Sequence, residues 1–136
     1  MKKRNLPAGK ASTIIYWIAT IWLALGMVST GMVQLLKQKT GPGGVDSAIA
    51  LGYPVYFLTI LGIWKMLGSV AVLIPKFPLL KEWAYAGFFF VMSGAAISHI
   101  VTGTANEIFP SLLLLILTLI SWYFRPSARK IISVNQ

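Results

Sequence analysis

Four long apolar segments limit what this chain can fold into. They cover roughly residues 13–36, 55–74, 83–103 and 108–124. The hydrocarbon core of a bilayer is about 30 Å thick and takes about 20 helical residues to cross, so three segments are long enough and the fourth is slightly short. Strands of a membrane barrel would be shorter and would alternate polar with apolar residues, which these segments do not. The pattern predicts an all-α fold, an integral membrane four-helix bundle.

The composition supports the same class. Of the 136 residues, 57% are hydrophobic and only 11% are charged, whereas soluble domains carry about 25% charged residues. The length allows one domain, which we expect to cover residues 1–136. The basic run at residues 2–4 also resembles the start of a signal peptide. The apolar run that follows is longer than a signal core, however, and no small-residue cleavage site ends it.

Lysine and arginine residues flank the apolar segments unevenly. If the amino terminus is inside, nine of these residues lie on the inner side and two on the outer side. The inner nine are Lys2, Lys3, Arg4, Lys10, Lys76, Lys81, Arg125, Arg129 and Lys130. The outer two are Lys37 and Lys39. Cytoplasmic loops are enriched in these residues, so both termini are expected to be cytoplasmic. The net charge of +9 therefore reflects topology, and no nucleic-acid partner is expected.

The loops and the small residues predict how the helices are connected and packed. Residues 37–44 are rich in glycine, and Asp46 is placed to cap a short turn that ends at Ala50. This segment is either a lid over the outer end of the bundle or a plain spacer. Small residues let membrane helices approach closely, so Gly62, Gly87 and Gly94 are expected at helix contacts. The fourth segment is mostly Leu and Ile and is expected to face lipid.

Lys65 is the most unusual residue, because it lies within the apolar run LGIWKMLGS at 61–69. It is about 14–15 Å from either end of its helix, too far for an extended lysine side chain to reach water. The three acidic residues all lie at or beyond helix ends, so no counter-ion is expected at this depth. A central lysine costs about 3 kcal/mol on insertion scales, and something must solvate it.

Other polar residues are expected to converge on Lys65 in the outer half of the bundle. Because helical side chains tilt toward the amino terminus of their own helix, Lys65 should point outward while His99 and Gln34 should point inward. Ser98 lies beside His99, and Glu107 is expected at the mouth. These five residues are the candidate ligand-binding set. Three interpretations stay open: hydrogen bonds that only hold helices together, a ligand or quinone-head site, and a proton or ion path.

Other chemistries are limited by the residues that the sequence lacks. With no cysteine and a single histidine, the chain cannot form thiolate metal sites or disulfides of its own, and no metal site is expected. No catalytic residue stands out, so the chain is not expected to be an enzyme on its own. A redox role would need a bound cofactor or a partner subunit.

Several short motifs resemble the DoxX-like family of small bacterial membrane proteins. They are LGYP at 51–54, LGIWKMLG at 61–68, PKFP at 75–78, LKEWAYAG at 80–87, GA at 94–95 and SH at 98–99. The resemblance covers about residues 13–125. It implies a four-helix, multi-pass protein of the bacterial inner membrane. Some relatives are subunits of redox enzymes or work beside them, and the resemblance brings no established catalytic residue.

The sequence and the resemblance together lead to one functional hypothesis. The chain would bind a quinone or a similar amphipathic ligand in support of an oxidoreductase subunit, with Lys65 and His99 bonding the carbonyl oxygens and Gln34 assisting. The alternative is a non-catalytic membrane scaffold or a small-molecule permease. No cofactor other than quinone is implied, and neither the oligomeric state nor the substrate follows from the sequence.

Overall fold

The computed structural model describes residues 5–129, and these are helical with short connections. The elements are α1 (Asn5–Leu35), α2 (Val45–Ala50), α3 (Tyr56–Leu73), α4 (Pro78–Val101), the 3₁₀ turn η2 (Ala105–Glu107), α5 (Phe109–Tyr123) and the 3₁₀ turn η3 (Ser127–Arg129). The described part of the chain contains no β-strand, so the all-α prediction is confirmed.

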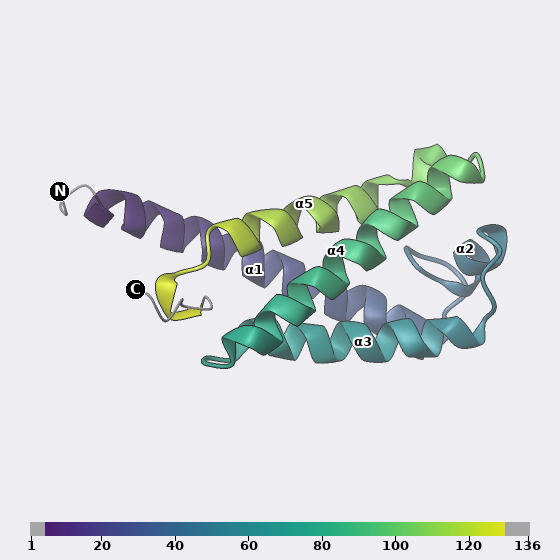
Figure 1. Ribbon diagram of the computed structural model, residues 1–136. Helices are drawn as coiled ribbons and strands as arrows, with labels where there is room; N and C mark the ends of the chain where they lie inside the picture. Colours follow the sequence, from purple (N-terminus) through teal and green to yellow (C-terminus); the bar gives the residue numbers. More distant parts are fainter. Residues whose placement is uncertain (1–4, 130–136) are drawn as a thin grey trace.

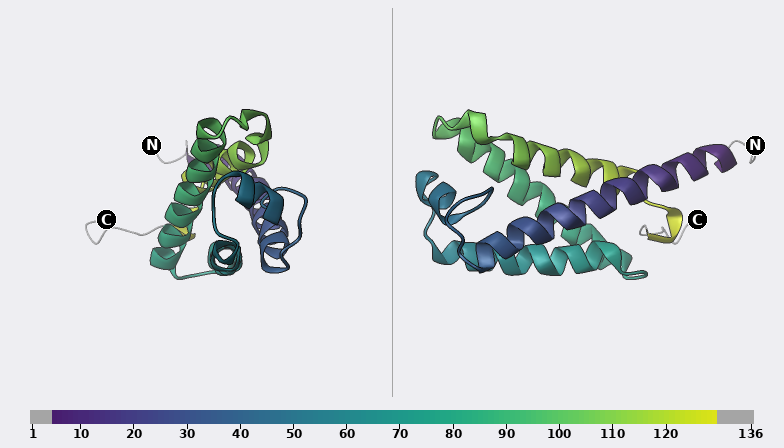
Figure 2. Two further views of the ribbon diagram at one scale, coloured as in Figure 1. Left: turned by 90° about the vertical axis from the view of Figure 1, so that its right-hand side faces the viewer. Right: turned by 180° about the vertical axis from the view of Figure 1, so that it is seen from behind.

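Each long helix packs against two others. α1 contacts α3 and α5, and α4 contacts the same two helices from the other side. In Figure 1, α3 and α4 lie close together near their connection and diverge toward the other end of the molecule. The short helix α2 lies at that second end, and Figure 2 shows it in front of the space between the long helices. The start of α1, the α3–α4 connection and η3 share the first end.

Three of the helices are long and apolar enough to cross a membrane. They are Gly9–Leu35 within α1, Tyr56–Leu73 and Pro78–Val101. α5 is equally apolar but has only 15 residues, which span about 22 Å at 1.5 Å per residue. The described residues thus form a multi-pass arrangement of apolar helices.

Proline residues explain where two of the helices begin. Pro78 occupies the first turn of α4, where the missing N–H costs nothing, so this helix starts earlier than the predicted residue 83. The preceding Lys76 and Phe77 have positive φ angles of 67° and 53°, and they form the sharp reversal after α3. Pro110 lies in the first turn of α5 as predicted.

Glycine residues have two different roles in the packing. Gly31 of α1 faces Gly62 of α3, where a Cβ on Gly62 would lie 3.0 Å from the Gly31 carbonyl oxygen and 2.6 Å from Leu35 Cγ. This close approach confirms the predicted contact at Gly62. At Gly87 and Gly94 the prediction was wrong, because a Cβ at either position would meet nothing within 4 Å. These two glycines leave open space.

α5 was expected to face lipid, and it does present an apolar face with Leu113, Ile116 and Leu119 about half exposed. Its buried face carries hydroxyl groups, since Ser121 is fully buried and Thr118 nearly so. The Ser121 Oγ lies 2.6 Å from Thr20 Oγ1 of α1 and 2.7 Å from the Tyr85 hydroxyl of α4. Three helices therefore meet at one hydroxyl group in the inner part of the fold.

Two cations bind the carboxyl end of α3. The last carbonyls of a helix lack partners and carry partial negative charge. Lys81, which is fully buried in α4, donates to Ala71 O (3.0 Å) and also to Ile74 O. Arg129 of η3 donates to the carbonyls of residues 72–74 and lies 4.8 Å over the Trp17 ring. Lys81 is thus a capping residue, and not an exposed loop residue.

Candidate ligand-binding site

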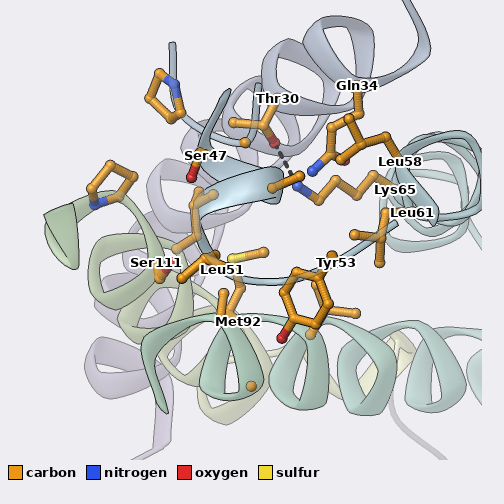
Figure 3. A pocket seen from close by; sticks show the side chains of 18 of the residues that line it. Thr30, Gln34, Ser47, Leu51, Tyr53, Leu58, Leu61, Lys65, Met92 and Ser111 are labelled. Atoms are coloured by element: carbon orange, nitrogen blue, oxygen red, sulfur yellow. Dashed lines mark hydrogen bonds between the residues drawn. The ribbon is translucent and has the colours of Figure 1, made fainter. Parts of the chain in front are cut away.

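A cavity of about 350 Å³ lies where α3 and α4 diverge, beneath α2. Drug-sized ligands occupy cavities of about 300–1,000 Å³ that are mainly apolar with a few polar groups. Most of this lining is apolar, and its polar side chains are few, namely Thr30, Gln34, Ser47, Tyr53, Lys65, His99 and Ser111. Figure 3 shows these walls, with Lys65 reaching from α3 toward α1 and with α2 across the cavity.

Lys65 is 5% exposed, and its amine lies on the cavity wall. Its Nζ donates to Thr30 Oγ1 over 3.1 Å, the hydrogen bond drawn in Figure 3. The Thr30 hydroxyl donates onward to Gly26 O (2.9 Å), so it is oriented to accept. Among residues 5–129, no second acceptor lies within hydrogen-bonding distance of Nζ, and no acidic residue lines the cavity. The amine therefore retains donor capacity toward the cavity.

Gln34 lies one turn beyond Thr30 on α1 and is 4% exposed. Its Oε1 is buried and accepts no hydrogen bond from any group in the described region. The loop packs tightly on this side chain, since a Cβ on Gly43 would lie 2.9 Å from Gln34 Nε2. A buried acceptor without a donor costs about 1–3 kcal/mol, so a ligand or water that donates to Oε1 would be favoured here.

His99 is 7% exposed and lines the same cavity from α4. Its Nδ1 lies 2.8 Å from Thr104 Oγ1, and that hydroxyl can donate to His99 O at 3.4 Å. When the Thr104 hydroxyl donates to His99 O, its oxygen accepts from Nδ1–H and Nε2 accepts; when it donates to Nδ1, Nε2 carries the proton and donates. His99 can thus offer the cavity either a donor or an acceptor, whereas the Lys65 amine offers donors.

Ser98 and Glu107 do not line this cavity. The Ser98 hydroxyl donates to Gly94 O (2.8 Å) and lies 2.5 Å from the Tyr53 hydroxyl, so it accepts from Tyr53, which does line the cavity. Glu107 is exposed in η2 and borders a smaller outer cavity that His99 also lines. The structure therefore brings together Lys65, His99 and Gln34 of the five predicted residues.

Residues that the sequence reasoning did not select complete the walls. Thr30 is the acceptor for Lys65, and its position four residues before Gln34 placed it on the same helical face. Ser47 and Ala48 show that α2 is part of the site, and Ala48 is buried. Asp46 does not cap this helix, because Gly44 is the N-cap residue and no side chain bonds there.

Comparison with known proteins gives one match. A sequence model described as the DoxX-like family matches residues 18–121, which covers α3 and α4 in full and every polar residue of the cavity. The match confirms the resemblance seen in the short motifs. No curated protein and no solved structure matches the chain significantly.

Proposed function

The chain belongs to the DoxX-like family, and on that premise we propose that it is a small membrane protein that binds a quinone or a similar amphipathic ligand in support of a redox partner. One observation carries the proposal. The cavity is mainly apolar, yet it contains a buried lysine with no acidic partner among the described residues. Ionisable residues at this depth in a membrane are costly and mark function by default.

The hydrogen-bonding groups suit a quinone head. The Lys65 amine donates, and a donor stabilises a carbonyl oxygen that gains negative charge on reduction. Gln34 Oε1 accepts, and His99 Nε2 accepts in one of its two tautomers, which suits the hydroxyl groups of the reduced form. The chain offers no redox centre of its own with its zero cysteines, so electrons would pass between the ligand and a partner oxidoreductase.

Binding of decylubiquinone to the purified full chain tests the proposal. We expect Lys65→Met to weaken binding about tenfold or more, because a hydrogen bond from a charged group contributes about 1.5–3 kcal/mol. Lys39→Met is the matched control, since Lys39 is exposed in the outer loop. A wild-type protein that binds no quinone, or a Lys65→Met variant that binds as tightly as wild type, would favour a scaffold or a permease instead.

The proposal includes a topology. We place the chain as one DoxX-like domain, residues 1–136, in the bacterial inner membrane, with α1, α3, α4 and α5 as a four-helix bundle and both termini cytoplasmic. The excess of cations at one end supports this orientation. Because the chain has no cysteine, Lys39→Cys and Ser127→Cys can each be labelled alone. In spheroplasts an impermeant maleimide should label only Lys39→Cys; labelling of Ser127→Cys without permeabilisation would contradict the orientation.

A further inference from the structure

A second cavity begins at Lys65 and extends in the opposite direction. It has a volume of about 430 Å³ and lies between α3 and α4. Trp64, Lys65 and Val91 line both cavities, so the two spaces meet at the lysine. From Val91 the second cavity follows α4 to Leu80, about 16 Å at 1.5 Å per residue. Lys65 thus lies between the first cavity, which has several polar side chains, and this second, apolar cavity, which we call the α3–α4 groove.

The groove is lined by side chains that suit a hydrocarbon chain. Lys65 is the one charged residue that lines it within residues 5–129, and the other residues are apolar, aromatic or glycine. Its floor is the buried Phe88, whose ring lies against Gly68, where a Cβ would come within 2.5 Å of Phe88 Cε1. Gly87 keeps the groove open, because a Cβ there would meet nothing within 4 Å.

The edges of the groove face outward along the apolar helices. Trp64 and Leu67 of α3 are 55% and 64% exposed, and Trp83 of α4 is 66% exposed. In a bilayer these edges would contact lipid chains, since α3 and α4 are both long enough to cross it. A lipid-soluble molecule would therefore reach Lys65 sideways, between α3 and α4, without passing through water.

We propose that the α3–α4 groove holds the apolar tail of the ligand whose polar head binds at Lys65. This inference rests on the proposed function and specifies its ligand as a single-chain amphiphile with an oxygen-bearing head. The head lies beneath α2, and the tail extends toward the α3–α4 connection. Long-chain quinones and long-chain fatty acids share this chemistry. The groove would select among them by the length of the hydrocarbon tail.

Filling the groove tests this arrangement. Gly87→Leu places a side chain in the open space, and Gly9→Leu is the matched control because Gly9 also has nothing within 4 Å of an added Cβ and lines neither cavity. Binding is measured for ubiquinone-0, which has the head only, for decylubiquinone and for palmitate. Gly87→Leu should weaken decylubiquinone about tenfold or more by displacing several methylene groups, while ubiquinone-0 and the control are unchanged. Palmitate binding that competes with decylubiquinone would extend the site to fatty acids, and its absence would restrict the site to quinones.

A photoreactive quinone provides a test on the unaltered protein. With a diazirine at the end of its chain, it should label residues 67–71 of α3 and 80–88 of α4. Labels confined to α1, α2 or α5, or a Gly87→Leu variant that retains the full chain-length preference, would overturn the tail groove while the Lys65 head site stands. If wild type binds none of the three probes, the proposed function fails and the groove assignment fails with it.

Discussion

At the scale of single residues, two sets of buried polar groups differ in how completely their hydrogen-bonding capacity is used. Thr20, Tyr85 and Ser121, the inner set, lie in the interior on the side of the α3–α4 connection and satisfy one another across three helices. Around the cavity, Lys65 retains unused donor capacity and Gln34 an unused acceptor within the described region. Satisfied groups are typical of structural roles, whereas unsatisfied buried groups call for a ligand or a water.

Removing the shared hydroxyl of the inner set should destabilise the fold. Ser121→Ala leaves Thr20 and Tyr85 without their common partner, and we expect the free energy of unfolding in detergent to fall by about 1–3 kcal/mol. Ser93→Ala is the control, because among residues 5–129 the one hydrogen bond of the Ser93 hydroxyl is to Phe90 O of its own helix at 3.3 Å. Equal effects of the two substitutions on unfolding would show that the inner set contributes no stability.

The sequence identified Lys65, His99 and Gln34 because each is expensive within an apolar helix and therefore conspicuous. It did not identify Thr30 or Tyr53, since hydroxyl groups are ordinary in membrane helices and become important only through a particular neighbour. Ser98 was selected for its place beside His99, yet its hydroxyl contacts Tyr53 and the backbone. The sequence shows which residues are polar, but the direction in which their side chains point depends on how the helices pack.

At the scale of elements, glycine spacing alone did not distinguish contact from open space. Gly62 faces the backbone of α1, while Gly87 and Gly94 border cavities. In the sequence, all three glycines look like small residues at a helix contact. The difference between contact and open space arises because α3 and α4 diverge. Likewise, α2 was predicted as a short turn over one end of the bundle, but the part that it takes in lining the cavity depends on how the preceding loop folds against Gln34.

This distinction predicts opposite effects for two glycine substitutions. Gly62→Ala should separate α1 from α3 and lower the free energy of unfolding by about 1–3 kcal/mol, because its Cβ would overlap Leu35 and approach the Gly31 carbonyl. Gly87→Ala should be neutral or stabilising by up to about 1 kcal/mol, since alanine is the better helix former. Thermal unfolding in one detergent measures both variants. If Gly87→Ala lowered the stability and Gly62→Ala left it unchanged, then Gly87 and not Gly62 would be the glycine at a close helix contact.

At the scale of the whole molecule, the two ends differ in construction. At the end where α3 meets α4, Lys81 and Arg129 bind the last carbonyls of α3, and Arg125 pairs with Glu82. At the other end the helices diverge and α2 covers the space between them. The charged contacts gather at the first of these ends and the α2-covered cavity lies at the second, while the apolar groove runs along α3 and α4 between them.

The length and apolar character of the segments were enough to predict the helices and the membrane class, because a bilayer imposes both directly. The cavities were not predictable, since they depend on crossing angles that many side chains determine together. The family match covers all the residues that line both cavities, so the cavities are a feature to look for in other DoxX-like chains.

The most direct test of a ligand site at Lys65 is mass spectrometry of the small molecules that copurify with the chain. Gly94→Leu fills the cavity at a position where an added Cβ meets nothing, and Gly9→Leu makes the same change outside it. We predict that wild type and Gly9→Leu retain an amphiphile in a fixed ratio to protein, and that Gly94→Leu and Lys65→Met lose it. The same molecules in equal amounts from all four proteins, or no bound amphiphile from wild type, would contradict the account.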